Sequence, residues 1–209
     1  MPAPSLWIGQ SPLVLASKSA SRRALLAAAG LPFEVEPAEI DERSVEEALS
    51  ERGGAESGLA LALALARAKA LAVSARRAGA LTLGADQTLT LDGRPMHKAP
   101  TRAAAAAALQ AMSGRTHRLA SAFTLARDGA VLAEGGDSAD MTMRALDATQ
   151  IARYLDIAGP AVLASVGAYQ IEGLGAHLFE SISGDHDTIL GLPMLKLLAA
   201  LRGLGLLAL

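Results

Sequence analysis

Residues 13–23 read LVLASKSASRR, and the character of the chain changes twice within them. Leu13–Ala16 is a short apolar run, as expected for a buried strand, and Ser17–Ser19 is polar. Ser21–Gly30 then has a helical composition and ends in glycine, the residue that most often follows a helix. The pattern therefore predicts a strand, a polar turn and a helix.

The polar turn is also a candidate phosphate-binding element. Free N–H groups and the dipole at a helix N-terminus stabilise anions, and arginine binds phosphate oxygens in pairs. The competing interpretation is a serine-capped helix with solvated arginines, which is the more common meaning of such a motif taken alone. The candidate residues are Ser17, Ser19, Ser21, Arg22 and Arg23.

Strand and helix patterns continue outward to the end of the chain. Composition and periodicity predict helices at 59–77, 103–112, 149–157 and 192–206, and Ser44 is the expected N-cap of a further helix. Strands are predicted at 33–35, 81–91, 117–126 and from residue 130, with hairpin signals at Asp92-Gly93 and Asp128-Gly129. No repeat or linker separates these elements, so we expect an α/β protein with one domain over residues 1–209.

Composition excludes several classes of protein. The absence of cysteine removes disulfides, thiolate catalysis and zinc-finger ligation. A net charge of -2 argues against broad electrostatic binding to nucleic acid or to an anionic membrane. The hydrophobic content of 51% comes largely from alanine, and the most apolar stretch carries Arg67 and Lys69 near its middle. Without a secretory pattern at the N-terminus, we expect a cytoplasmic protein with neither a membrane nor a nucleic-acid partner.

Carboxylates and lysines from separate elements form a second candidate site. Asp86 interrupts an otherwise apolar strand, where a carboxylate is costly to bury, and Asp41 and Glu42 follow an earlier strand. With Lys69 and Lys98, these groups would suit Mg²⁺ and phosphate. The alternative is that Asp41 and Glu42 are solvated loop residues and that Lys69 lies on the surface.

Other common motifs are missing. The four histidines show neither the i, i+4 spacing nor the HxxEH arrangement of metal ligands, so we expect them to be structural or exposed. The chain has no dinucleotide fingerprint, no P-loop and no GxSxG nucleophile elbow. These absences argue against nicotinamide cofactors, P-loop NTPase chemistry and a serine hydrolase.

The ordered set of motifs resembles the Maf family of nucleoside triphosphate pyrophosphatases, also described as septum-formation inhibitors. The resemblance spans nearly the whole chain and is carried by LVLAS at 13–17 with Arg22-Arg23, IDE at 40–42, Lys69, GAD at 84–86, Lys98, SGRTH at 113–117, Gly184 and GLP at 191–193. It implies a mixed twisted sheet flanked by helices, with two lobes around a central cleft. This architecture is similar to that of inosine triphosphate pyrophosphatases, and such proteins are commonly homodimers.

The resemblance also implies a reaction and roles for individual residues. The reaction is hydrolysis between the α and β phosphates of a nucleoside triphosphate, with a divalent metal, Mg²⁺ or Mn²⁺, and it removes modified or surplus nucleotides. Asp86 would be the general base or a metal ligand, and Glu42 would hold the metal or orient water. Lys69 and Lys98 would act with Ser17 and Arg22 on the triphosphate and on the leaving pyrophosphate.

Three positions distinguish branches of this family, and they correspond to Ser21, Gln87 and Glu172. Gln87 and Glu172 are similar to the branch that prefers 7-methyl-GTP over dTTP and UTP. Ser21 departs from both branches, because one has a bulky aromatic residue there and the other has arginine. His97 and Ala99 depart from the glycine and proline that usually flank the lysine aligned with Lys98. A nucleotide-binding regulator of cell division, without essential turnover, is the alternative function.

Overall fold

The predicted strand, turn and helix at 13–30 are present in the computed structural model, which describes residues 5–51 and 57–209. The strand β1 (Leu13–Leu15) is fully buried, and the helix α1 (Ala20–Ala28) begins after Ser19, whose side chain accepts a hydrogen bond from the backbone N–H of Arg22 at 3.3 Å. The serine therefore caps the helix. The polar turn therefore lies between the end of the buried strand and the start of the helix.

The sheet is mixed, as the family resemblance implied, and it is open. Its strand order is β2-β1-β3-β5-β6-β7, with β4 paired to β3. The strand β1 runs parallel to β2 and β3, and the remaining pairs are antiparallel. The bounds of the other strands are β2 Phe33–Val35, β3 Thr82–Leu91, β4 Arg94–Met96, β5 Thr116–Arg127, β6 Ala130–Met143 and β7 Phe179–Ser183.

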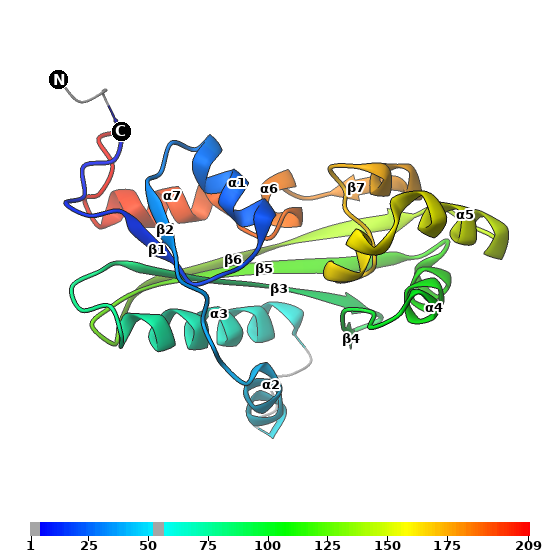
Figure 1. The fold of residues 1–209 in the computed structure, drawn as a ribbon, viewed down its shortest axis with the longest axis horizontal. Helices are drawn as coiled ribbons and strands as arrows, with labels where there is room; N and C mark the ends of the chain where they lie inside the picture. Colours follow the sequence, from blue (N-terminus) through cyan, green and yellow to red (C-terminus); the bar gives the residue numbers. More distant parts are fainter. Residues whose placement is uncertain (1–4, 52–56) are drawn as a thin grey trace.

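Both predicted hairpin turns are confirmed. Asp92 and Gly93 connect β3 to β4 with φ angles of 51° and 75°, and Asp128 and Gly129 connect β5 to β6 with 51° and 77°. Positive φ at both central positions of a two-residue turn matches the right-handed twist of the strands that it joins. The long β5–β6 hairpin extends along the whole sheet in Figure 1.

Helices cover both faces of the sheet. The long helix α3 (Gly58–Ser74) packs against β3, β5 and β6 on one face, while α1 and α7 (Met194–Gly203) lie on the other face (Figure 1). The remaining helices are α2 Glu42–Glu51, α4 Arg102–Met112, α5 Ala148–Ala158, the short α6 His186–Ile189 and the 3₁₀ turns η1 Pro160–Ala164 and η2 Leu174–Leu178. In the part of the chain that the structure describes, none of the helices is both long and apolar enough to cross a bilayer.

Two details of the predicted helices are wrong. Ser44 is not an N-cap: α2 already begins at Glu42, and Asp41 accepts hydrogen bonds from the backbone N–H groups of Arg43 and Ser44 at 3.1 and 3.2 Å. Aspartate is as good a cap as serine, and it comes first along the chain. The closing helix is shorter than predicted, since it starts after Pro193 and ends at Gly203.

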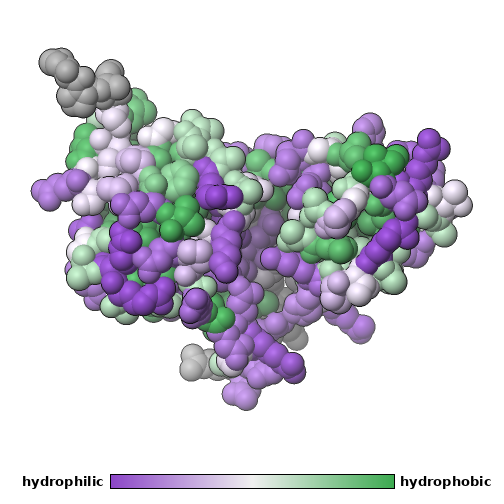
Figure 2. All heavy atoms as spheres, in the orientation of Figure 1, coloured by the Kyte–Doolittle hydropathy of each residue, from purple (hydrophilic) through white to green (hydrophobic). Residues whose placement is uncertain are grey.

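The two largest hydrophobic cores lie at opposite ends of the sheet, and β3 contributes to both. Leu83 and Ala85 belong to the core between β1, α1 and α7, whereas Leu89 and Leu91 belong to the core beneath α4 and α5. Asp86 and Gln87 occupy the middle of the same strand. Figure 2 shows the molecule hollowed between its two halves, with hydrophilic residues at the rim. The polar residues of β3 therefore lie where one core ends and the other begins.

Candidate active site

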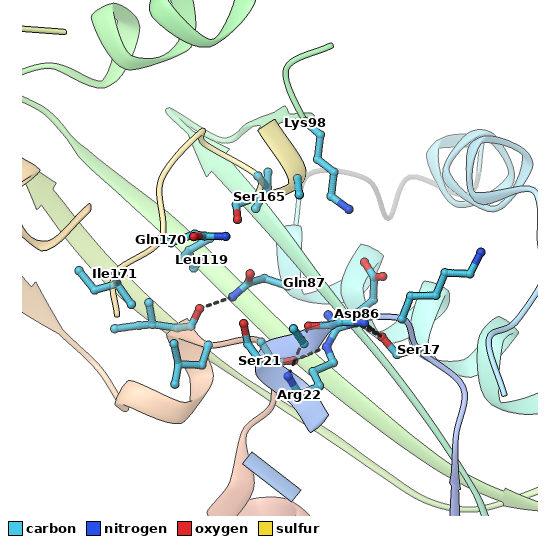
Figure 3. A pocket seen from close by; sticks show the side chains of 18 of the residues that line it. Ser17, Ser21, Arg22, Asp86, Gln87, Lys98, Leu119, Ser165, Gln170 and Ile171 are labelled. Atoms are coloured by element: carbon cyan, nitrogen blue, oxygen red, sulfur yellow. Dashed lines mark hydrogen bonds between the residues drawn. The ribbon is translucent and has the colours of Figure 1, made fainter. Parts of the chain in front are cut away.

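A cavity of about 690 Å³ opens between the two halves of the molecule, over the middle of β3. Most of the predicted site residues line it, although they come from both faces of the sheet and from distant segments (Figure 3). Arg23 is the exception, because it is exposed and is not part of the lining. The predicted residues in the lining are Ser17, Ser19, Ser21, Arg22, Glu42, Lys69, Asp86, Gln87, Lys98 and Glu172.

Lys69 connects two carboxylates at one side of this cavity. Its ammonium group forms ion pairs with Asp86 and, at 2.6 Å, with Oε1 of Glu42. The Lys69 side chain is only 12% exposed, so the interpretation of it as a surface lysine is wrong. Burial opposes ionisation of Glu42, but its hydrogen bond to Lys69 and the charge of that lysine outweigh this effect and lower the pKa of Glu42.

Close packing of α3 on β3 brings Lys69 to Asp86. A Cβ atom on Gly84 would lie 2.1 Å from the carbonyl oxygen of Ala66 and 2.5 Å from the backbone nitrogen of Ala70, which is closer than real contacts allow. Glycine at this position therefore lets the helix backbone rest directly on the strand. The ion pair between Lys69 and Asp86 depends on that short distance between the two elements.

Arg22 is the buried cation of the cavity. Its Nη1 donates to Oγ of Ser17 at 2.9 Å, and its Nε donates to the carbonyl oxygen of Gly191 at 2.8 Å. Gly191 has a φ of +102°, which L side chains rarely adopt. Burial lowers the pKa of Arg22 from 12.5, whereas the charges of Asp86 and Glu42 raise it, and an arginine stays protonated under such conditions. A fixed positive charge therefore faces the two carboxylates.

Gln87 has a defined orientation of its side-chain amide. Its Nε2 donates toward Oγ of Ser121 at 3.1 Å and toward the carbonyl oxygens of Thr188 and Ile189 at 3.1 and 2.8 Å. Because acceptors surround the nitrogen, a flipped amide would place its own carbonyl oxygen against them. Gln87 therefore offers its Oε1, an acceptor, to the cavity, on the side of Gln170 and Ser165 in Figure 3.

The opposite wall comes from the glycine-containing segment after residue 160. Ser165, Tyr169, Gln170 and Ile171 line the cavity there, and the sequence analysis did not identify them. They carry no local pattern, because the segment consists of short 3₁₀ turns and irregular backbone. The isolated β-bridge between Lys98 and Val166 joins this wall to the loop after β4.

Glu172 also belongs to this wall, and it contacts the polar turn across the cavity. Oγ of Ser21, in the first turn of α1, donates to Oε1 of Glu172 at 3.3 Å. The two halves of the molecule therefore meet through this hydrogen bond. Asp41, in contrast, is not part of the lining, because its carboxylate caps α2. Its hydrogen bonds to Ser44 hold its pKa below the usual value.

Asp86 and Glu42 are the candidate metal ligands. Residues 5–51 and 57–209 contain no group of three or more histidines and acidic residues placed to hold an ion. The two carboxylates nevertheless converge on one point, where Lys69 supplies the positive charge. One or two carboxylates, together with phosphate oxygens and waters, are the usual ligands of Mg²⁺ at nucleotide sites, so the donor set fits that ion.

Comparisons of the sequence with known proteins match one family over most of the chain. The family model described as Maf-like protein matches residues 12–204. A nucleoside triphosphate pyrophosphatase of Nitrobacter winogradskyi is 52% identical over 205 residues, covering 98% of this chain and 100% of the relative. A 7-methyl-GTP pyrophosphatase of Rhizobium etli is 54% identical over 193 residues, covering 92% of this chain and 96% of the relative.

Proposed function

Since this chain belongs to the family of Maf-like proteins, we propose that it is a nucleoside triphosphate pyrophosphatase. The reaction adds water across the bond between the α and β phosphates and yields a nucleoside monophosphate and pyrophosphate. The printed names of the relatives favour this enzyme over a regulator of cell division that binds nucleotides without turnover. We also propose a cytoplasmic location, from the N-terminal sequence, and a homodimer, as the family resemblance implies.

The observation that carries this proposal is the convergence of cations and carboxylates in one cavity. Arg22 and Lys69 are largely buried there, and Lys98 lines the same space. A triphosphate carries several negative charges, and its hydrolysis adds charge to the leaving pyrophosphate. Cations held in place before the reaction stabilise that charge without reorganisation, which is the main contribution to such catalysis.

In the proposed reaction, Asp86 takes the proton of the attacking water. Lys69 occupies its Oδ1, so Oδ2 is the oxygen that would accept the proton. As the water oxygen bonds to phosphorus, the phosphoanhydride bond breaks, and pyrophosphate leaves with the electron pair. Glu42 contacts Lys69 from the other side and orients the water or the ammonium group.

A divalent cation, Mg²⁺ or Mn²⁺, would be held by Asp86 and Glu42 together with phosphate oxygens. Such an ion supplies positive charge that neutralises the phosphate oxygens during bond cleavage. Lys69 forms ion pairs with both carboxylates. Its ammonium group therefore keeps them close together before the substrate binds.

For the base, we propose a preference for guanine and in particular for 7-methyl-GTP. Gln87 offers Oε1 to the cavity, and Glu172 offers a carboxylate on the opposite wall. Two acceptors match the ring N1–H and the exocyclic amine of guanine, which are adjacent donors. Uracil and thymine present only one ring N–H between two carbonyl groups, so they match this pair less well.

The test is pyrophosphate release from 7-methyl-GTP, GTP, ITP, dTTP, UTP and CTP, with Mg²⁺, with Mn²⁺ and with a chelator. We expect metal-dependent release, fastest with 7-methyl-GTP. Asp86→Asn should reduce kcat by about a hundredfold or more, since it keeps the size of the side chain and removes its basicity. The matched control is Asp156→Asn, at a largely exposed carboxylate paired with Arg102 outside the cavity.

Orthophosphate as the product would contradict the proposed reaction. Near-normal turnover of Asp86→Asn would exclude the assigned role of Asp86 while leaving the reaction intact. Equal rates with chelator and with Mg²⁺ would show that the cations of the protein suffice. Faster hydrolysis of dTTP and UTP than of both guanine nucleotides would contradict the assignment of Gln87 and Glu172 as the pair that selects the base.

A further inference from the structure

A cluster of three rings adjoins the cavity wall that carries Glu172, and one of the rings is part of that wall. His117 on β5 lies 5.6 Å from Tyr169 and 5.7 Å from Phe179, measured between ring centroids. Tyr169 and Phe179 meet edge to face at 4.8 Å. The chain contains six aromatic residues in total, and two of them are in this cluster with the only fully buried histidine among the described residues.

The cluster holds both ends of one cavity-lining loop. Tyr169 lines the cavity, and Gln170, Ile171 and Glu172 follow it in the same lining. The loop then passes through η2 and reaches Phe179, where β7 begins. Both residues that flank the loop therefore contact His117, which belongs to one of the two longest strands of the sheet.

A directed hydrogen bond adds to the packing of the rings. Nε2 of His117 and the hydroxyl of Tyr169 lie 2.7 Å apart, and that hydroxyl donates to Sδ of Met141 at 3.4 Å. Tyrosine has a single hydroxyl proton, so both contacts are made together when the imidazole carries its proton on Nε2 and donates to Tyr169. Nδ1 has no hydrogen-bond partner among the described residues. An unpaired acceptor nitrogen costs less free energy to bury there than an unpaired N–H donor.

We propose that His117 is a positioning residue for nucleotide binding, acting through Tyr169 on the loop that carries Gln170 and Glu172. This inference rests on the proposed function for the identity of the ligand. His117 does not line the cavity, so it cannot contact the substrate itself. Its donated hydrogen bond fixes the tyrosine hydroxyl, and the tyrosine fixes the start of the loop. The ligand affected is the nucleoside end of the triphosphate, which Glu172 faces.

The experiment compares His117→Phe, His117→Gln and Tyr169→Phe. His117→Phe keeps a ring and loses the donor, so KM for 7-methyl-GTP should rise about threefold to tenfold with kcat within about twofold. Tyr169→Phe should have the same effect, and the double variant should be no worse than either single variant, because both changes remove one interaction. His117→Gln retains an N–H near the position of Nε2 and should recover most of the affinity.

Two further measurements separate positioning from general stability. Amide hydrogen exchange in residues 170–178 should be faster in His117→Phe and Tyr169→Phe than in the unsubstituted protein. The matched control is Ser113→Ala, which removes partly buried hydrogen bonds to Leu146 at 2.7 and 3.0 Å outside the cavity. This control should lower the melting temperature and leave KM and the exchange of residues 170–178 unchanged.

The outcomes distinguish this inference from the proposed reaction. If the unsubstituted protein releases no pyrophosphate, the proposed function fails, and binding of α,β-methylene GTP replaces KM as the test of His117. If His117→Phe and Tyr169→Phe bind or turn over nucleotide like the unsubstituted protein, the positioning role is wrong. Strictly additive effects of the two substitutions would also contradict it, since they would not then act through one interaction.

Discussion

Ser21 donates a hydrogen bond to Glu172 at 3.3 Å, although the two residues are 151 positions apart. One belongs to the first turn of α1 and the other to the loop behind which the ring cluster packs. The hydrogen bond joins the two halves of the molecule at the cavity. The serine gives the carboxylate a hydrogen-bond donor without the bulk of an aromatic ring or the charge of an arginine.

Removing that hydroxyl should weaken selection of the base. In Ser21→Ala, Glu172 loses its partner across the cavity, and we expect KM for 7-methyl-GTP to rise about twofold to fivefold, with a smaller change for UTP. Steady-state kinetics with both nucleotides measures the ratio of the two KM values. Ser50→Ala is the control, because that hydroxyl donates to Glu46 on the exposed face of α2. An unchanged ratio in Ser21→Ala would show that Glu172 is oriented without it.

The orientation of Gln87 predicts that a carboxylate is not tolerated there. Gln87→Glu would replace the amide nitrogen with an acceptor oxygen that faces Ser121 and the carbonyl oxygens of Thr188 and Ile189. We expect a loss of about 1–3 kcal/mol in the free energy of unfolding at pH 8, which decreases as the new side chain is protonated at lower pH. Urea unfolding at several pH values measures this loss.

Gln87→Met separates the two roles of the amide. It removes the acceptor offered to the base without adding charge next to the backbone carbonyls, so we expect weaker nucleotide binding with a smaller loss of stability than in Gln87→Glu. Equal stability of Gln87→Glu and the unsubstituted protein at pH 8 would show that the amide is free to turn.

Gly84 should not tolerate a methyl group. The Cβ of Gly84→Ala would lie 2.1 Å from the carbonyl oxygen of Ala66, so α3 must move away from β3. We expect a loss of about 3 kcal/mol in the free energy of unfolding. We also expect a fall in kcat, because Lys69 would move relative to Asp86. Thermal unfolding and pyrophosphate release measure the two effects.

Gly203 provides the matched control for this substitution. It ends α7, and a Cβ atom there would meet nothing within 4 Å. Gly203→Ala should therefore stabilise the protein by up to about 1 kcal/mol, through the helix preference for alanine. Normal stability of Gly84→Ala would show that the contact between the helix and the strand relaxes freely.

Because of His117, the free energy of unfolding should decrease as the pH falls into the acid range. Burial lowers its pKa to about 4, with the charge of Asp140 acting in the opposite direction. Histidine in the unfolded chain has an ordinary pKa near 6.5. Between about pH 6.5 and pH 4 the unfolded chain therefore binds a proton that the folded protein does not. Stability therefore falls as the pH drops from about 6.5 toward 4, by about 2 to 3 kcal/mol.

Comparing the acid-induced loss of stability in the unsubstituted protein and in His117→Phe isolates the contribution of His117 from that of the other titrating groups. Urea unfolding of the unsubstituted protein and of His117→Phe at pH 7.5 and pH 4.5 should show a smaller loss on acidification in the variant. Parallel losses in the two proteins would mean that His117 gains its proton in the folded state as easily as in the unfolded chain.

Local patterns in the sequence were sufficient for most of the secondary structure. The apolar run before Ser17, the turns at Asp92-Gly93 and Asp128-Gly129, and the alanine-rich helix α3 lie where they were predicted. Each depends on interactions among residues close in sequence, such as turn geometry and helix propensity. Where two residues competed for one role, as Asp41 and Ser44 did for the cap of α2, the local signal chose the wrong one.

The candidate site was predicted as a set of residues but not as an arrangement. The order of the motifs indicated Asp86, Glu42 and Lys69, yet burial of Lys69 contradicts the expectation that a helical lysine is usually exposed. Ser165, Tyr169 and Gln170 were missed, because their segment has no periodicity and lines the cavity only through folding of the chain.

The sequence by itself thus determined most of the elements up to residue 158, the closing helix, and the chemical types of group available to the site. Tertiary structure alone decided which of these groups meet. Arg22 reaches the carbonyl of Gly191, the amide of Gln87 turns its nitrogen toward Thr188 and Ile189, and Ser21 meets Glu172. The physical reason is that such contacts join residues that are distant along the chain. Their geometry follows from the packing of two cores on one strand, which no local pattern contains.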